Sequence, residues 1–143
     1  MAMNMLSSES RGARIGSLVW SALPETGAAD VRRLNRATAF IEQNLASRDL
    51  TPEAVASAAN VSRSTLYRLF KSRGGVRHYI LQRRLSMASE RLGDPAEFRQ
   101  VGELAFDLGF VSEAHFSRAF RQAFGAPPGA FRWALGEERR TSA

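Results

Sequence analysis

A short basic phrase occurs twice in this chain of 143 residues. The first copy, TLYRLFKSRGG, begins at Thr65, and the second, AHFSRAFRQAFGAPP, begins at Ala114. Four positions correspond between the copies: Leu66 and Phe116, Arg68 and Arg118, Phe70 and Phe120, Lys71 and Arg121. The apolar residues of each copy recur every three or four positions, which is the period of an α-helix. The repeat therefore restricts the chain to folds that contain two similar amphipathic helices.

Each copy follows a shorter helical segment and a tight turn. The matched positions are Val55 and Leu104, Ala56 and Ala105 in the short segments, and Val61 and Phe110 in the turns. The small alanines allow two helices to cross closely, and Asn60 and Gly109 can adopt the positive φ that such a turn needs. Matched residues are 49 positions apart before the turn and 50 after it, so the second turn is one residue longer. These features predict two helix-turn-helix units.

The chain as a whole predicts an all-α fold of about seven helices, because no stretch alternates convincingly with period two. Candidate N-caps are Asp30, Thr51, Ser62, Asp94 and Ser112, and candidate stop signals are Asn60, Gly74–Gly75, Gly109 and Gly125. Between the two units a linker helix is expected over residues 76–92. Its expected buried stripe is Val76, Tyr79, Ile80, Met87, Ala88 and Leu92.

Four parts follow from this pattern. Residues 1–29 are rich in Ser, Gly and Ala without sustained periodicity, and we expect a flexible segment or the remnant of a linker. Residues 30–92 form the first helix-turn-helix unit with the linker helix, and residues 93–136 form the second unit. A last short helix is expected over residues 130–135, followed by a frayed tail at 137–143.

The charge of the chain favours an anionic partner. Its net charge is +6 and its pI is about 11.1. Lys71 is the only lysine, so nearly all the positive charge is arginine, which can contact phosphate and guanine through two hydrogen bonds at once. A GC-rich genome also encodes arginine in place of lysine, but that does not explain where the arginines stand. Nucleic acid is the expected partner, with an acidic protein or membrane surface as the alternatives.

In each repeated helix the apolar and polar residues separate onto two faces. The expected buried residues are Leu66, Leu69 and Phe70 in the first helix and Phe116, Ala119 and Phe120 in the second. The expected outward residues are Arg63, Ser64, Tyr67, Arg68 and Lys71, then Glu113, Ala114, Ser117, Arg118 and Arg121. In a helix-turn-helix unit such a second helix enters the major groove of DNA. A duplicated helical bundle with solvated arginines is the plain structural alternative.

From about Asp30 to Arg132 the chain resembles the DNA-binding domain of the AraC/XylS family of bacterial transcription regulators. The strongest match is ELAFDLGFVSEAHFSRAFRQAFGAPPGAFR, and LYRLFKSRGG and YILQRRLSMASERL match the first half and the connecting helix. The resemblance implies two helix-turn-helix units held apart by a rigid linker helix, each reading one major groove. It further implies double-stranded DNA and RNA polymerase as partners and a cytoplasmic location.

By motif position, the resemblance implies two sets of base-facing residues near 62–73 and 112–124. They are Ser64, Tyr67 and Arg68 in the first unit and Glu113, Ala114, His115 and Arg118 in the second. Arg68 and Arg118 are the expected guanine readers, and Glu113 could accept a hydrogen bond from a cytosine amino group. Ala114 differs from the polar residues often found there, so the second unit is expected to make fewer hydrogen bonds to bases.

Other kinds of function lack support in the sequence. His78 and His115 stand far apart without ligand partners, cysteine is absent, and neither a phosphate loop nor a nucleophile motif occurs, so we expect no enzyme, metal or cofactor. No apolar run reaches the length of a membrane span. A basic helical adaptor for an acidic protein remains the rival function. No small-molecule domain is evident, so the chain is either a stand-alone regulator or a piece of a longer one.

Overall fold

The computed structural model describes the backbone of residues 24–142, and within that range it contains α-helices, one 3₁₀ turn and no strand. The elements are α2 (Pro24–Gln43), α3 (Pro52–Ala59), α4 (Arg63–Phe70), η1 (Lys71–Arg73), α5 (Val76–Leu92), α6 (Val101–Asp107), α7 (Glu113–Phe124) and α8 (Pro128–Ser142). The expected all-α fold is confirmed, and the seven α-helices of the described range match the expected number.

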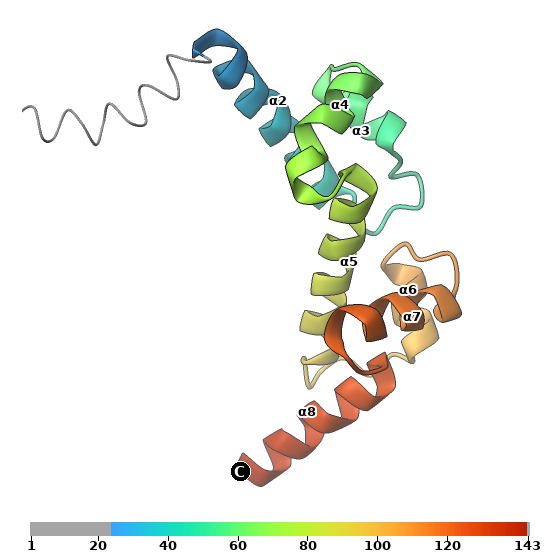
Figure 1. Ribbon diagram of the computed structural model, residues 1–143. Helices are drawn as coiled ribbons and strands as arrows, with labels where there is room; N and C mark the ends of the chain where they lie inside the picture. The colour runs from blue at the N-terminus through green and yellow to red at the C-terminus, as the bar shows by residue number, and fades with distance from the viewer. Residues whose placement is uncertain (1–23, 143) are drawn as a thin grey trace, which may run out of the picture.

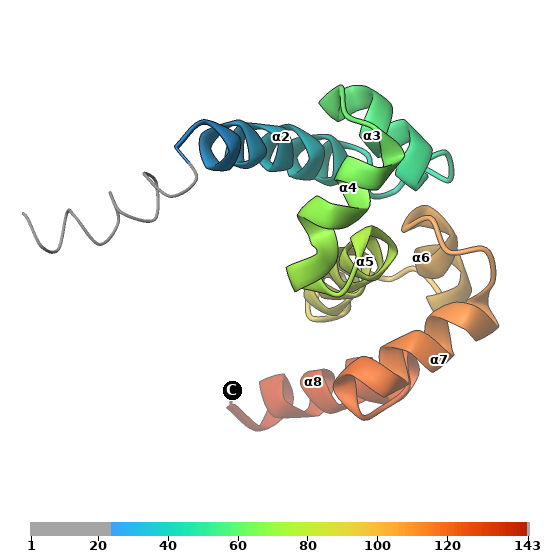
Figure 2. The ribbon, with the colours of Figure 1, turned by 45° about the horizontal axis from the view of Figure 1, so that its top comes forward.

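Helix α5 occupies the middle of the molecule. In Figures 1 and 2 helices α2, α3 and α4 lie around one end of α5, and α6, α7 and α8 lie around the other end. The expected linker helix is confirmed at its predicted bounds, Val76–Leu92. It places the two repeated helices, α4 and α7, near opposite ends of one continuous helix.

Two separate hydrophobic clusters stabilise the two ends. The first collects apolar residues of α2, α3 and α4, and α5 adds Val76 and Ile80 to it. The second collects residues of α6 and α7, and α5 adds Leu85, Ala88 and Leu92. Tyr79 and Met87, which we expected on the buried stripe of α5, are partly buried at its margins, whereas Leu85 was missing from the expected stripe. The apolar side of α5 thus divides between two cores.

The first helix begins earlier than the sequence suggested. Asp30 was expected to cap it, but α2 begins at Pro24 and Asp30 lies within the helix. Proline fits a first helical position, and Ala28 and Ala29 have high helix propensity, so the chain is already helical before the apolar periodicity starts. The rest of the segment that we expected to be flexible, residues 1–23, lies outside the described residues.

The expected start of the helix before the second turn was also wrong. Asp94 was predicted as its N-cap and Glu97 as part of a capping box, but α6 begins at Val101. The Asp94 carboxylate accepts a hydrogen bond from the Ala96 amide at 2.9 Å, and the Glu97 carboxylate accepts one from the Arg99 amide at 3.0 Å. These local turns compete with helix formation, so residues 94–100 form an irregular loop.

The C-terminal segment is helical where a frayed tail was expected. Helix α8 runs through Pro128–Ser142. Arg139 donates a hydrogen bond to the Gly93 carbonyl at 2.8 Å, and Glu137 pairs with Arg140 one turn along the helix. Basic residues in the last turn also suit the helix dipole. No helix in the described range 24–142 is long and apolar enough to cross a membrane.

Candidate nucleic-acid interface

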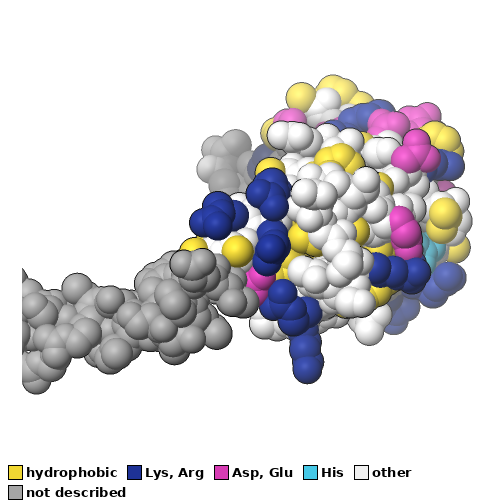
Figure 3. All heavy atoms as spheres, turned by 90° about the horizontal axis from the view of Figure 1, so that it is seen from above, with side chains coloured by type: hydrophobic (Ala, Val, Ile, Leu, Met, Phe, Trp, Pro, Cys, Tyr) yellow, Lys and Arg dark blue, Asp and Glu magenta, His cyan; other side chains and the backbone are white. Residues whose placement is uncertain are grey.

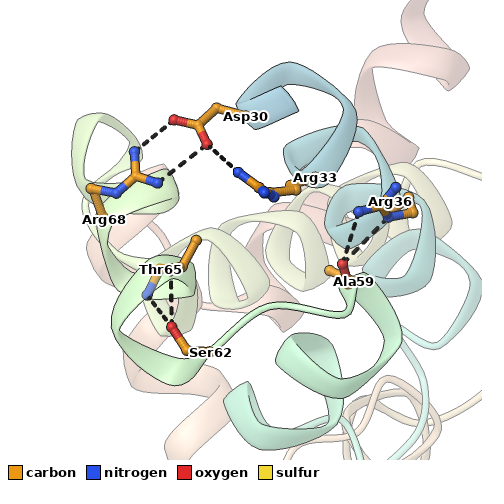
Figure 4. Close-up of polar contacts among 7 residues, drawn as sticks. All are labelled: Asp30, Arg33, Arg36, Ala59, Ser62, Thr65 and Arg68. Atoms are coloured by element: carbon orange, nitrogen blue, oxygen red, sulfur yellow. Dashed lines mark hydrogen bonds and ion pairs between the residues drawn. The ribbon is translucent and has the colours of Figure 1, made fainter. Parts of the chain in front are cut away.

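The first turn joins α3 to α4 with a left-handed residue and a serine cap. Asn60 has φ 56°, and the next amide, that of Val61, donates to the Ala56 carbonyl at 3.0 Å. Ser62 then accepts a hydrogen bond on its Oγ from the Thr65 amide at 3.1 Å, which begins α4 (Figure 4). The turn therefore satisfies the free backbone groups at the end of one helix and the start of the next.

The second turn repeats this arrangement between α6 and α7. Gly109 has φ 85°, the Phe110 amide donates to the Ala105 carbonyl at 3.1 Å, and Ser112 Oγ accepts from the His115 amide at 3.0 Å. The extra residue predicted for this turn is Val111, whose side chain is 80% exposed. The two turns have matching hydrogen bonds as well as a matching sequence pattern.

The two repeated helices bury the expected faces. Leu66 and Phe70 of α4, and Phe116 and Phe120 of α7, are fully buried, whereas Leu69 and Ala119 are partly buried. Ten of the eleven predicted contact residues are exposed: Arg63, Ser64, Tyr67, Arg68, Lys71, Glu113, Ala114, His115, Arg118 and Arg121. The other, Ser117, is partly buried. Each helix therefore presents a largely polar face to solvent.

Two predicted contact residues on α4 bind each other. Arg63 Nε donates to the Tyr67 hydroxyl at 3.3 Å, and Arg63 Nη1 lies 3.5 Å from the carboxylate of Glu53 on α3. The hydrogen bond to Tyr67, together with the nearby Glu53 charge, raises the pKa of the Arg63 guanidinium. These contacts hold a cation and an aromatic ring together at the start of the exposed face.

Arg68, the expected guanine reader of the first unit, is held by a carboxylate from the preceding helix. Its Nη1 and Nη2 donate to Asp30 Oδ2 and Oδ1 at 2.6 and 3.2 Å (Figure 4). Arg33, one turn further along α2, donates to Asp30 Oδ1 at 3.1 Å. The Arg68 hydrogen bonds are the main cause that lowers the pKa of Asp30 below its ordinary value. The sequence pattern did not identify Asp30 as part of this site, since its position suggested a helix cap.

A second contact fastens α2 to the same unit. The Arg36 guanidinium donates through Nε and Nη2 to the Ala59 carbonyl, at 3.3 and 3.1 Å, at the end of α3 (Figure 4). Helix α2 thus contacts both helices of the first unit through side chains on successive turns.

The predicted contact residues of α7 have different neighbours. The Glu113 carboxylate lies over Gly102 of α6, where a Cβ atom would come within 2.7 Å of Oε2. The His115 ring lies 5.7 Å from the ring of Phe110, measured between centroids. Within the described residues Arg118 and Arg121 form no ion pair. The second helix thus presents its two arginines without the carboxylate that holds Arg68.

Positive charge gathers on part of the surface. Seen from above, a row of Lys and Arg side chains runs down the left side of the molecule, where few Asp or Glu lie, and on the right and upper edges further Lys and Arg lie among most of the Asp and Glu (Figure 3). Such an uneven distribution attracts a polyanion to one side of a protein. The described residues contain no group of three or more His, Cys, Asp or Glu side chains placed to hold a metal ion.

An arginine on the buried side of α5 links the two units. Arg84 Nε and Nη2 donate to the Leu45 and Ser47 carbonyls, both at 2.8 Å, and Nη1 donates to the Gly109 carbonyl at 3.4 Å. Burial lowers the pKa of this guanidinium, and the three carbonyls satisfy it without an acid. Its position between Ile80 and Ala88, four residues from each on the buried stripe, was the sequence signal for this role.

Arg48 makes a second link between the units. Its guanidinium carbon lies 3.6 Å from the centre of the Phe106 ring, and Nη2 donates to the Phe110 carbonyl at 3.5 Å. Because Arg48 follows α2 and both partners belong to the second unit, this contact crosses the same boundary as Arg84.

Known proteins resemble the chain over the same region. A family model described as a helix-turn-helix domain matches residues 55–134. The transcriptional activator NphR of a Rhodococcus species is 38% identical over 111 residues, which cover 75% of this chain and 32% of NphR. The chain spans about a third of the length of such curated relatives.

Solved structures share the arrangement of the helices. An AraC-type regulator from Chromobacterium violaceum has a TM-score of 0.67 at 29% identity, covering 76% of this chain and 96% of that one. The DNA-binding domain of AdpA, solved in complex with a target DNA, has a TM-score of 0.65 at 25% identity, covering 75% and 96%. The chain therefore belongs to the AraC/XylS family of helix-turn-helix transcription regulators.

Proposed function

We propose that this chain binds double-stranded DNA at specific sequences and regulates transcription, with α4 and α7 entering two adjacent major grooves. The repeat carries this proposal: two turns with matching hydrogen bonds each expose a polar helix face that contains arginine, and one linker helix joins them. Successive grooves on one face of DNA lie about 34 Å apart. Residues 30–92 and 93–136 would then each read one groove.

The proposed contacts divide into base readers and phosphate contacts. Arg68 and Arg118 are the proposed guanine readers, because a guanidinium can donate two hydrogen bonds to the O6 and N7 atoms of guanine. Ser64, Tyr67, Glu113, Ala114 and His115 are the other proposed base-facing residues, and Arg63, Lys71, Ser117 and Arg121 complete the proposed contact surface. Contacts to phosphate position the protein, and contacts to bases specify the sequence.

RNA polymerase is the proposed protein partner, and the bacterial cytoplasm, where the chromosome lies, is the proposed location. A transcriptional activator such as NphR is about three times longer than the matched region, so activities of its other parts do not transfer to this chain.

Base reading is tested with single arginine variants. After a preferred site is selected from a random DNA pool, Arg68→Ala and Arg118→Ala should each weaken binding by about 1–3 kcal/mol and relax specificity at one position. Arg140→Ala is the matched control, because it removes one exposed charge from α8. Equal losses on the selected site and on random DNA would show that the two arginines contact only phosphate.

The two-groove arrangement is tested with altered DNA. The DNA segments read by α4 and by α7 are the two sub-sites of the proposed binding site. Inserting about 5 base pairs between them turns them to opposite faces of the DNA, because B-DNA repeats every ~10–10.5 base pairs. Most of the specific affinity should be lost. Unchanged binding would mean that only one unit reads DNA.

A salt titration of DNA binding distinguishes the proposed function from the rival one, an adaptor for an acidic protein. The logarithm of DNA affinity should fall linearly with the logarithm of salt concentration, as counterions are released from the duplex.

A further inference from the structure

The contact between Arg68 and Asp30 leaves one edge of the guanidinium open. The Asp30 carboxylate accepts hydrogen bonds from the two terminal nitrogens of the Arg68 guanidinium, Nη1 at 2.6 Å and Nη2 at 3.2 Å. A guanidinium has five N–H donors in a planar fork, so this contact uses one hydrogen on each terminal nitrogen. The Nε hydrogen and the second Nη2 hydrogen point along the side edge, where they form another parallel pair of donors.

The open edge matches the acceptors of a guanine base. A guanine presents O6 and N7 side by side in the major groove, and two parallel donors satisfy both. The Arg68 side chain is 55% exposed on the outward face of α4, whereas the Asp30 side chain, on α2, is only 20% exposed. The carboxylate can therefore hold the end of the guanidinium while the donors of the side edge stay available to a base.

We propose that Asp30 is a positioning residue for DNA reading: it fixes the guanidinium of Arg68 so that the free side edge meets a guanine. The inference rests on the proposed function. An exposed arginine samples many rotamers, and restraining it before DNA arrives removes part of the entropy cost of binding. Asp30 would thus increase specificity without touching the DNA.

The surroundings of Asp30 fit this role. Arg33 donates to Asp30 Oδ1 at 3.1 Å, and Arg36 ties α2 to the end of α3, so the carboxylate is itself held in place (Figure 4). Because the pKa of Asp30 is lowered, the carboxylate is charged at neutral pH. One carboxylate between two arginines leaves a net positive group, which does not repel DNA.

The second unit provides an internal comparison. Arg118 occupies the matched position on α7, but it has no ion pair within the described residues. If the carboxylate sharpens base reading, the sub-site read by α4 should be more strictly specified at its guanine than the sub-site read by α7.

The decisive measurement is the base preference of Asp30→Asn. The variant keeps the shape of the side chain but loses its charge and one acceptor oxygen. We expect the preference for guanine over the other bases at the Arg68 position to fall about fivefold, as expected for losing one exposed charge-assisted contact. The preference at the Arg118 position should not change. Binding curves on DNA sites that differ at one base pair give both ratios.

A matched control separates this effect from a change in net charge. Glu42 also lies on α2 and holds an arginine at both oxygens, with Arg83 Nε and Nη2 donating at 2.6 and 3.1 Å. Glu42→Gln therefore removes the same charge and a similar ion pair, but the arginine belongs to α5 and not to a proposed DNA-reading helix. Both variants should bind random DNA equally, and only Asp30→Asn should change the base preference.

The double variant shows whether Asp30 acts through Arg68. In an Arg68→Ala background, Asp30→Asn should have no further effect on base preference. If Asp30→Asn leaves the preference unchanged while Arg68→Ala abolishes it, the positioning role is wrong and the proposed function stands. If Asp30→Asn tightens specific binding, the carboxylate competes with DNA and the inference is overturned. If the wild-type protein selects no site at all, the proposed function itself fails.

Discussion

Arginine side chains occur in three different settings in this molecule, and each setting decides which groups the guanidinium can bind. Arg68 is exposed and held at one end by Asp30, which leaves donors for a base. Arg118 is exposed at the matched position and forms no ion pair with any residue of the described range 24–142. Arg84 lies against three backbone carbonyls, where its charge is satisfied inside the protein. Positive charge alone therefore does not identify a DNA contact.

The matched phenylalanines are expected to act on stability and not on DNA contact. Phe70 and Phe120 are fully buried, so replacing either with alanine should lower the free energy of unfolding by about 3–5 kcal/mol. Chemical denaturation followed by circular dichroism measures the loss. Phe98→Ala is the control, because that ring is 87% exposed and should change stability by less than about 0.5 kcal/mol. A folded Phe70→Ala or Phe120→Ala protein of normal stability that no longer binds DNA would contradict this assignment.

At the ends of the helices, local hydrogen bonds and tertiary packing together determine which residue is suitable. Ser62 and Ser112 cap their helices as the sequence predicted, because a cap needs only a side chain and an amide three residues away. Gly109 meets a further demand: besides its φ of 85°, a Cβ atom there would lie 2.9 Å from Arg84 Nη2. The second turn thus requires glycine for its backbone and for the link to α5. Asn60 serves the first turn, where the left-handed conformation alone is needed.

The loop before α6 is expected to make stability depend on acid. Hydrogen bonds from Arg99 lower the pKa of Glu97 to about 2, from an ordinary 4.5. Since the folded pKa lies below the unfolded one, this stabilisation is complete above the unfolded pKa and is lost as the pH falls toward the folded value. Glu97→Gln should lower the melting temperature at neutral pH and should reduce the drop between neutral pH and about pH 3.

Thermal unfolding at the two pH values tests this prediction. Glu138→Gln, which removes an exposed carboxylate from α8, is the control and should leave the drop unchanged. An equal drop in wild type and Glu97→Gln would show that other carboxylates determine the acid sensitivity.

Within the described residues, helix α5 and two arginines, Arg84 and Arg48, join the two units. Helix α5 contributes to both hydrophobic cores, and Arg84 bonds to carbonyls that precede α3 and follow α6. Arg48 adds a contact with the Phe106 ring and the Phe110 carbonyl. If α4 and α7 read DNA as proposed, a stiff link between them would fix the spacing of the two DNA segments and would make the second contact intramolecular.

Arg84→Met should weaken the requirement for a fixed spacing between the two DNA sub-sites. Methionine fills similar space but donates no hydrogen bond, so three carbonyls lose a donor, and the unfolding free energy should fall by about 1–3 kcal/mol. Affinity for the preferred site should fall, and the penalty for altered spacing between the sub-sites should shrink. Arg83→Met is the control, because Arg83 pairs with Glu42 of the first unit. If Arg84→Met keeps the full spacing preference, α5 and the hydrophobic cores hold the units without Arg84.

The sequence by itself determined the features that depend on neighbours along the chain. The period of apolar residues, the capping serines and the left-handed turn residues act within a few positions, so the paired units and the linker helix could be predicted. The features that depend on contacts between distant positions of the chain were decided only by the tertiary structure. Asp30 meets Arg68 across 38 positions, and Arg84 meets its carbonyl partners across 25 to 39. At Asp94 and Glu97 the side chains had two local options, helix cap or turn, and the path of the chain between α5 and α6 selected the turn. The physical reason is that such polar side chains accept whichever partners folding brings within hydrogen-bonding distance.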